Sequence, residues 1–152
     1  MPSFPEVNIL LVEDDEIDVR SVKRAFQTQK IANPIFQASD GVEALEMLRG
    51  EAGHAPLPRP YLILLDLKMP RMNGIQFLHE IRADTELHDS IVFVLTTSDD
   101  DRDKVAAYEK NVAGYLLKQD VGDDFMNAIR MLDYFTISVQ FPLKSVNAAT
   151  TA

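Results

Sequence analysis

Short apolar runs rich in branched residues recur along this chain, and segments with the spacing of helices separate them. The strong runs are Val7 to Val12, Tyr61 to Leu65, Ile91 to Leu95, and Tyr115 to Leu117. Continuously apolar runs of this kind are typical of strands that are buried on both faces. The run Ile35 to Ala38 is weaker and follows an Asn-Pro turn, so we predict an edge or near-edge strand there.

The segments between the runs repeat their apolar residues at three- and four-residue steps, which indicates one buried face of a helix. The predicted faces are Val19, Val22 and Phe26; Val42, Leu45 and Leu48; Phe77, Leu78 and Ile81; and Val105, Tyr108 and Val112. A further apolar segment, residues 125–135, predicts a fifth helix. Strict alternation of strands and helices favours parallel pairing with right-handed crossovers, which gives an α/β, three-layer, doubly wound fold.

Capping residues support the predicted helix ends. Asn73 with Gln76 three residues later resembles a capping box, and Ser98 precedes an acidic first turn at residues 99–101. Gly50 and Gly114 are predicted to lie just past two helix ends. Residues 51–60 hold three prolines in their second half, so we expect an extended surface loop inserted within a single domain.

Composition limits the partners and the compartment. A chain of 152 residues provides one substantial core and no room for an effector domain. The formal net charge of −9 disfavours nucleic acid and membrane surfaces as partners. Cysteine is absent, no apolar run approaches the roughly 18 residues of a membrane span, and the first residues do not resemble a signal peptide, so we expect a cytoplasmic protein.

The residues that finish the predicted strands carry chemistry, because ligands bind at the carboxyl ends of parallel strands. These residues are Glu13, Asp14 and Asp15 after the first strand, Asp66 after the third, Thr96 to Ser98 after the fourth, and Lys118 after the fifth. Crowded carboxylates repel one another unless a cation joins them, and Mg²⁺ is the hard, oxygen-preferring cation that suits them. Asp66 could then attack phosphorus, with Lys118 neutralising the phosphoryl oxygens and Thr96 donating a hydroxyl hydrogen bond.

Four motifs in order carry a family resemblance. They are Leu11-Val12-Glu13-Asp14-Asp15, Leu65-Asp66-Leu67-Lys68-Met69-Pro70-Arg71-Met72-Asn73-Gly74, Leu95-Thr96-Thr97-Ser98 and Gly114-Tyr115-Leu116-Leu117-Lys118. Over about residues 6–135, the chain resembles the receiver domain of two-component response regulators. The resemblance implies the flavodoxin-like (βα)5 receiver fold with strand order 2-1-3-4-5.

The resemblance also implies a role for each matching residue. Asp66 would accept a phosphoryl group from a sensor histidine kinase. Asp14 would bind Mg²⁺, Glu13 would hold it directly or through water, and the backbone carbonyl of Lys68 would be a further ligand. Thr96 and Lys118 would contact the phosphoryl oxygens. Tyr115 would change rotamer together with Thr96 when the protein switches. Asp15 falls outside the family's acidic pair, so we assign it to a helix N-terminus.

Two residues depart from the family pattern. Gln119 stands where proline usually follows the lysine in the family, so we expect a trans peptide bond after Lys118. Lys68 could cover the path of a hydrolytic water, so we predict a long-lived phosphoryl state. The proline-rich loop, the Thr-Thr-Ser sequence and the tail also resemble single-domain regulators that partner phytochrome kinases in cyanobacteria and other bacteria.

The predicted fifth helix is apolar on more than one face. Met126, Met131, Tyr134 and Phe135 lie beyond its core face and need a second cover. Either the apolar extension at residues 136–143 covers them or a second subunit does, and we favour a homodimer through helix four, strand five and helix five. Residues 144–152 are small and polar, which predicts a disordered tail.

The main prediction is a stand-alone, Mg²⁺-dependent phosphoacceptor that signals through contacts with a downstream protein and is not an enzyme. A haloacid-dehalogenase-type phosphatase would need an acid where Lys68 stands. A flavodoxin-like electron carrier would need a phosphate-binding loop where Glu13, Asp14 and Asp15 stand. A receiver-shaped scaffold that is never phosphorylated is the remaining alternative.

Overall fold

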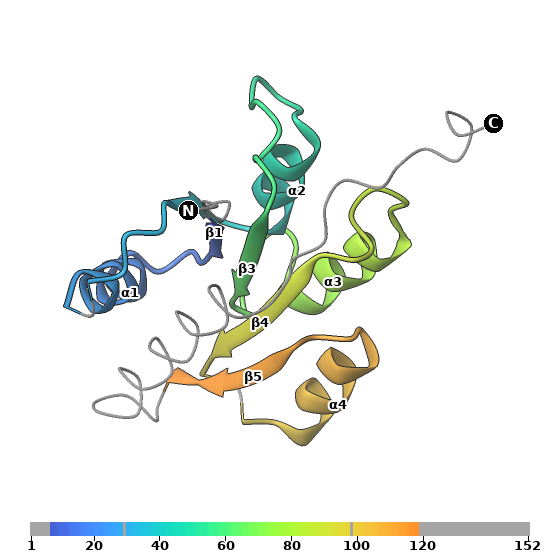
Figure 1. Ribbon diagram of the computed structural model, residues 1–152. Coiled ribbons are helices and arrows are strands. Elements are labelled where there is room, and N and C mark those ends of the chain that lie inside the picture. Colours follow the sequence, from blue (N-terminus) through green and yellow to red (C-terminus); the bar gives the residue numbers. More distant parts are fainter. Residues whose placement is uncertain (1–6, 29, 98, 119–152) are drawn as a thin grey trace, which may run out of the picture.

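Five parallel strands alternate with helices along the chain, as Figure 1 shows. The computed structural model describes residues 7–28, 30–97 and 99–118. In chain order the elements are β1 (Asn8–Val12), α1 (Glu16–Thr28), β2 (Ile35–Ala38), α2 (Gly41–Arg49), β3 (Tyr61–Leu65), α3 (Gly74–Ala83), β4 (Ile91–Thr96), α4 (Asp101–Glu109) and β5 (Gly114–Leu117). The predicted strands are confirmed to within one residue at each end.

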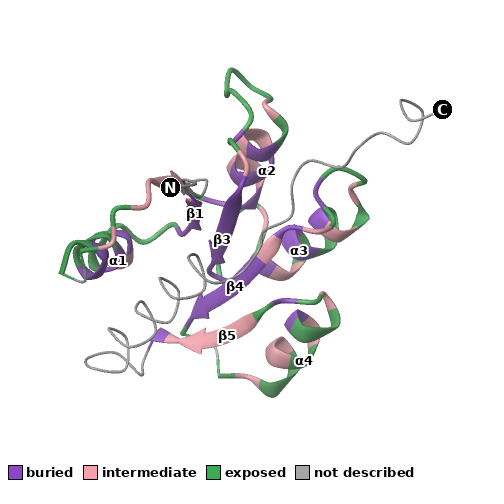
Figure 2. Ribbon diagram, viewed as in Figure 1, coloured by how far each residue is buried: buried purple, intermediate pink, exposed green. Residues whose placement is uncertain are grey.

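The strand order in the sheet is β2-β1-β3-β4-β5, which confirms the receiver-type topology. β3 lies at the centre, and all five of its residues are buried, as its unbroken apolar sequence predicts. The outer strands β2 and β5 are mostly half-buried, and Figure 2 shows the contrast between β5 and the buried strands β3 and β4. The weak run at Ile35–Ala38 is therefore an edge strand.

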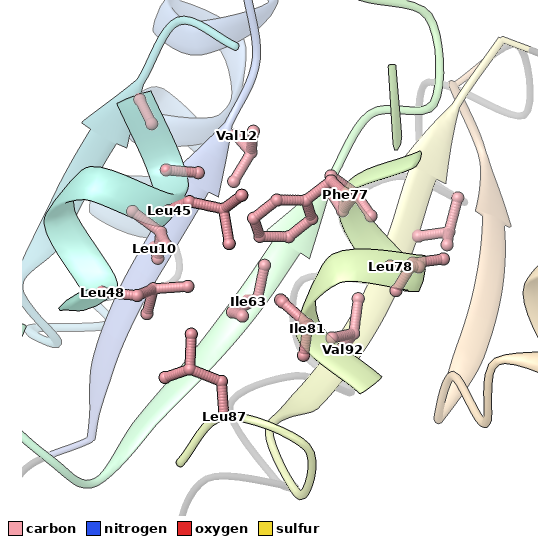
Figure 3. Packing of buried hydrophobic residues seen from close by; sticks show 14 of the residues in the cluster. Leu10, Val12, Leu45, Leu48, Ile63, Phe77, Leu78, Ile81, Leu87 and Val92 are labelled. Atoms are coloured by element: carbon pink, nitrogen blue, oxygen red, sulfur yellow. The ribbon is translucent and has the colours of Figure 1, made fainter. Parts of the chain in front are cut away.

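Alternate residues of each strand face two separate cores. On one face Leu10, Val12, Ile63 and Val94 pack against α2, α3 and α4, and Figure 3 shows Phe77, Leu45 and their neighbours filling this space. On the other face Ile9, Leu11, Leu62 and Leu64 pack against Val19, Val22 and Phe26 of α1. This arrangement is the predicted three-layer sandwich. Burial of these apolar side chains provides most of the driving force for folding.

Two predicted helix ends are confirmed. The Asn73 side chain accepts a hydrogen bond from the Gln76 amide, and the Gln76 side chain accepts one from the Asn73 amide, which is a full capping box. Gly50 ends α2 in the left-handed conformation with φ 73°, where its missing Cβ removes the usual strain.

Two other predicted ends are wrong. Asp100, not Ser98, is the N-cap of α4, because its carboxylate accepts a hydrogen bond from the Arg102 amide; Ser98 itself lies outside the described residues. Gly114 is the first residue of β5 and not a helix C-cap. The helix has already ended at Glu109, and Asn111 adopts a φ of 60°.

The predicted core face of α4 is also wrong. Val105 and Tyr108 are 57% and 53% exposed, whereas Ala107 is fully buried. Val112 is buried, but it follows the end of the helix and so does not belong to its face. The small Ala107 side chain lets α4 approach the core, and this turns the larger residues toward solvent.

The proline-rich connection between α2 and β3 is mostly exposed, as predicted, but it is anchored at its second half. Leu57 packs into the core beside α2, and its amide donates a hydrogen bond to the Met47 carbonyl. The Arg59 guanidinium lies 5.3 Å from the centre of the Tyr61 ring.

Within the described ranges no helix is long and apolar enough to cross a membrane. The predicted fifth helix and both tail segments, residues 136–143 and 144–152, lie outside the described residues.

Arg82, near the end of α3, ties three segments together through backbone carbonyls. Its guanidinium donates hydrogen bonds to the carbonyls of His88 and Ser90, at 2.7 and 2.8 Å, and to those of Lys110 and Asn111, at 2.6 and 3.1 Å. The planar guanidinium with five donors suits this task, whereas an ammonium group does not. Arg82 therefore holds the turns before β4 and β5 against α3.

We expect Arg82→Ala to lower the free energy of unfolding by about 2 kcal/mol, because hydrogen bonds from a charged donor are lost and carbonyls lose their partner. Arg82→Lys should recover only part of this loss. Urea denaturation followed by circular dichroism measures the effect, with Arg20→Ala on the exposed face of α1 as control. Equal stability of the Arg82→Ala and Arg20→Ala proteins would show that Arg82 does not have this role.

Candidate functional site

The sheet delivers three charged residues to one side of its carboxyl edge. Glu13 follows β1, Asp66 follows β3, and Lys118 follows β5. Because strand residues alternate between faces, these positions continue the series Leu11, Leu64 and Leu116, which faces α1. All three charged side chains are buried. Strand register thus brings together residues that are far apart in the sequence.

Three carboxylates form a group that is able to hold a metal ion. Glu13, Asp14 and Asp66 each offer an oxygen, and these atoms lie within 4.8 Å of one another. Glu13 and Asp66 are buried, whereas Asp14 is exposed and forms the open side of the group. The predicted convergence of these acids is thus present in the geometry.

Lys118 lies between these carboxylates. Its ammonium Nζ donates a hydrogen bond to Glu13 Oε2, and it lies 3.5 Å from Asp66 Oδ2. It also donates to Asp18 Oδ2 at 2.8 Å. Burial alone would lower the pKa of Lys118, but the hydrogen bonds with Asp18 and Glu13 outweigh burial and raise that pKa above its ordinary value. Lys118 is therefore a cation at neutral pH that reaches the Asp66 carboxylate.

Asp18, in the first turn of α1, is a contact that the sequence analysis missed. The available signal was its position, because Asp18 lies in the first turn of the helix that follows Asp14 and so stays close to the carboxyl edge of the sheet. Asp15, by contrast, has the helix N-terminal role that was predicted for it. Its Oδ1 accepts hydrogen bonds from the amides of Ile17 and Asp18 at 2.8 and 3.3 Å.

Glu13 is the acid that the site perturbs most clearly. Burial raises the pKa of Glu13 to about 7, against the lowering effect of its hydrogen bond from Lys118; the nearby Asp66 carboxylate also raises it. Its Oε1 accepts a hydrogen bond from the Asp15 amide at 3.1 Å, which fixes the carboxylate toward the cluster. The buried Glu13 and Asp66 thus carry more negative charge than the single ammonium of Lys118 balances.

Thr96 and Tyr115 lie on the opposite face of the sheet from Lys118. Thr96 is the last residue of β4 and is fully buried. Tyr115 of β5 is half-buried, pairs in register with Val94 and packs against the core under α2, α3 and α4. Val94 and Thr96 lie two residues apart in β4 and therefore point to the same face of the sheet. Tyr115 and Thr96 thus share that face, as the predicted coupled rotamer change requires.

The loop after Asp66 is open to solvent. The Lys68 side chain is exposed, and its amide donates a hydrogen bond to Asp66 Oδ1 at 3.3 Å. Met69 and Met72 are half-buried and fill space at the edge of the core. A cleft of about 450 Å³ opens beside this loop, and Asp14, Lys68 and Asp103 of α4 are among the residues that line it. The cleft therefore borders the exposed member of the carboxylate group.

The donor set fits a hard divalent cation. Mg²⁺ takes oxygen ligands at about 2.0 to 2.1 Å, so ligands on opposite sides of the ion lie about 4.2 Å apart. The three carboxylates come close to this spacing, and their negative charge exceeds that of Lys118. Glu13, Asp14 and Asp66 are the side chains that would hold the ion.

Gln119 and the predicted interface residues Met126, Met131, Tyr134 and Phe135 lie outside the described residues.

Comparison with known proteins decides the family. Residues 9–130 match the response regulator receiver domain. The chain belongs to the response regulator receiver domain family. Receivers are signalling modules, and membership of this family implies interaction with a sensor histidine kinase.

Relatives of this receiver include phytochrome response regulators. Response regulator Rcp1 of Synechocystis sp. is 36% identical over 133 residues, which cover 88% of this chain and 90% of Rcp1. The crystal structure of the phosphorylated cyanobacterial phytochrome response regulator RcpA has a TM-score of 0.82 at 31% identity and covers 91% of this chain and 100% of RcpA. The Mn²⁺-bound form of Rcp1 has a TM-score of 0.80 at 34% identity, with 91% of this chain and 100% of that chain covered.

We expect Asp14→Asn to weaken the binding of Mn²⁺ by about tenfold or more. Loss of a residue that only supports a metal ligand already weakens metal binding by about tenfold. The physical reason is that a neutral amide replaces one of the negative ligands of the cation. Electron paramagnetic resonance of free Mn²⁺ during a titration measures the affinity. Asp15→Asn is the matched control, because asparagine still caps α1. Equal affinities of the two variants would refute the assignment.

Proposed function

We propose that this receiver is a Mg²⁺-dependent phosphoacceptor whose phosphorylated residue is Asp66. The observation that carries the proposal is the contact of the Lys118 ammonium with Asp66 and Glu13 at an edge where three carboxylates converge. A buried nucleophilic carboxylate beside a cation suits attack on a phosphoryl group. Bound Mg²⁺ would supply positive charge that offsets the negative charge of the transferring phosphoryl oxygens.

Asp66 is the nucleophile in the proposed step. One carboxylate oxygen of Asp66 forms a bond to phosphorus, while the phosphorus–nitrogen bond of a kinase phosphohistidine breaks. The electron pair of that bond stays on the imidazole nitrogen, which takes up a proton from solvent. Lys118 neutralises phosphoryl oxygens in the transition state, and the Lys68 carbonyl would be a further ligand of the cation. Thr96 donates a hydrogen bond from its hydroxyl to an oxygen of the arriving phosphoryl group.

A change of position of Thr96 would carry the signal outward. Thr96 is fully buried, so moving it toward a phosphoryl oxygen opens space that a neighbouring aromatic ring is able to fill. Tyr115 lies on the same face of the sheet at the half-buried edge strand. We assign Tyr115 the role of the ring that follows Thr96, and with it the coupling of phosphorylation to the surface of α4 and β5.

We expect the protein to gain one phosphoryl group when it is incubated with Mg²⁺ and acetyl phosphate, as intact-mass spectrometry measures. Asp66→Ala should abolish the gain, since it removes the nucleophile, and a chelator of divalent cations should do the same. Asp15→Asn should still be phosphorylated. No gain in mass with any phosphodonor would favour the scaffold alternative. Steady release of inorganic phosphate from an added phosphomonoester would favour the phosphatase alternative.

Lys68 is the residue that we expect to prolong the phosphorylated state. Its side chain is exposed, and Lys68 lines the cleft beside Asp14 at the carboxyl edge of the sheet. From this position the side chain would cover the approach of water to Asp66. Lys68→Asn should therefore dephosphorylate faster, measured by decay of the phosphorylated mass after removal of the donor. A slower or unchanged decay would contradict this role.

The phosphodonor that we propose is a sensor histidine kinase of the phytochrome class, because phytochrome response regulators are among the relatives of this chain. We propose that the output is association with another protein, and that the receiver forms a homodimer through α4, β5 and the residues after them. The exposed Val105 and Tyr108 of α4 are apolar groups that such an interface would cover. Sedimentation that stays monomeric at all concentrations, with and without fluoroberyllate, would exclude the dimer.

A further inference from the structure

A two-pronged ion pair joins the start of α2 to the loop that follows the phosphoacceptor strand. We call residues 67–73 the acceptor loop. Arg71 of this loop donates from Nε to Asp40 Oδ2 at 2.7 Å and from Nη2 to Asp40 Oδ1 at 3.2 Å. The Asp40 side chain is only 8% exposed, so its carboxylate has a fixed place in the fold. A guanidinium held by two parallel hydrogen bonds is fixed in orientation as well as in distance.

Asp40 is itself held by the helix that it begins. It is the N-cap of α2, and its Oδ1 accepts a hydrogen bond from the Glu43 amide at 2.9 Å. Burial alone would raise the pKa of Asp40, but the hydrogen bonds from Arg71 and Glu43 outweigh burial and hold that pKa below its ordinary value. Asp40 is therefore a charged and rigid anchor at neutral pH.

The backbones of the two segments also touch. The Gly41 amide donates a hydrogen bond to the Met72 carbonyl at 3.3 Å. A Cβ at position 41 would lie 2.8 Å from Met72 Cγ and 2.9 Å from the Met72 carbonyl oxygen, so only glycine allows this approach. The ion pair and this contact together connect α2 with the acceptor loop.

Arg71 adopts a backbone conformation that costs free energy. Its φ is 55°, in the left-handed region that residues with a Cβ rarely occupy. Such a conformation persists where the surrounding structure holds it. The ion pair with Asp40 and the contact of Gly41 with Met72 are interactions that hold it here. Without the ion pair the acceptor loop would relax to a shape with less strain.

The shape of the acceptor loop matters because the loop begins directly after Asp66. The Lys68 amide donates to Asp66 Oδ1, and the Gly74 amide donates to the Leu67 carbonyl at 2.9 Å. The Lys68 carbonyl, a proposed cation ligand, lies in the chain between the Lys68 and Gly74 amides that donate these two hydrogen bonds. Relaxation of the loop would therefore move both an Asp66 contact and a ligand carbonyl.

We propose that Asp40 and Arg71 are positioning residues that hold the acceptor loop in the shape that binds the divalent cation and presents Asp66. This inference rests on the proposed function, since it assigns the pair a purpose at the same site. Neither residue touches the carboxylate cluster itself. Their effect would pass through the backbone of the acceptor loop.

The sign of the expected effect separates positioning from simple electrostatics. Arg71 is a cation on the loop beside the metal site, so removing its charge would by Coulomb's law strengthen the binding of another cation. Loss of positioning has the opposite sign and weakens binding. A fall in Mn²⁺ affinity in Arg71→Ala is therefore an effect that charge removal does not produce.

The variants are chosen to separate these effects. Arg71→Ala removes the pair, and Arg71→Lys keeps the charge without the two-pronged contact. Asp40→Asn keeps the cap of α2, because asparagine also accepts from the Glu43 amide, but loses the charge that Arg71 requires. Arg49→Ala is the matched control. It breaks the Arg49–Asp84 pair, at 3.1 Å, which joins the far ends of α2 and α3.

Two measurements on the full chain test the proposal. The first is Mn²⁺ affinity from paramagnetic resonance, where Arg71→Ala and Asp40→Asn should each bind about 10-fold more weakly, Arg71→Lys should recover only part of the loss, and Arg49→Ala should bind as wild type does. The second is hydrogen exchange of the Gly41 and Gly74 amides in the metal-free protein, read by nuclear magnetic resonance. Exchange there should accelerate in Arg71→Ala and not in Arg49→Ala.

Unchanged or tighter Mn²⁺ binding by Arg71→Ala would overturn the proposal, as would unchanged exchange at both glycine amides. Failure of the wild-type protein to bind Mn²⁺ would instead count against the proposed function. In that case the exchange measurement still decides the positioning role, because it needs no metal. Accelerated exchange would support the role of the pair in holding the loop, and unchanged exchange would exclude it.

Discussion

Two buried carboxylates, Glu13 and Asp66, share one ammonium at the carboxyl edge of the sheet, and their negative charge is only partly balanced. A buried acid beside another acid is costly, and burial raises the pKa of Glu13 accordingly. Lys118 lowers that cost by contacting both acids and Asp18 of α1 as well. The remaining negative charge faces Asp14 and solvent, which is where a divalent cation would enter.

The sheet is what makes this arrangement possible. β3 is buried on both faces and lies between β1 and β4, so Asp66 follows a strand whose residues are all buried. Alternation along parallel strands then sends Glu13, Asp66 and Lys118 toward α1, and Thr96 and Tyr115 toward the other helices. The charged cluster and the proposed switch therefore lie on opposite faces of the sheet at its carboxyl edge, and β4 and β5 connect them.

The strands and the meeting of Glu13, Asp14, Asp66 and Lys118 could be predicted from the sequence, because unbroken apolar runs and the residues that end them are local features of the sequence. The face of α4 could not. Val105, Tyr108 and Val112 have helical spacing, but the turn at Asn111 and the close approach at Ala107 depend on the packed structure. The clamps made by Arg82 and by Arg71 with Asp40 were also missed, since each joins segments distant in the sequence through carbonyls or a single side chain.

The central claim is that Asp66 and its neighbours form a cation-dependent site for a phosphoryl group. The most direct measurement is fluorine nuclear magnetic resonance with fluoroberyllate, a phosphoryl mimic that needs no kinase and no stable phosphoryl bond. We predict bound fluorine resonances that appear only when Mg²⁺ is present and that are absent from the Asp66→Ala protein. Resonances of free fluoroberyllate alone, at saturating Mg²⁺ and with the wild-type protein folded, would contradict the account.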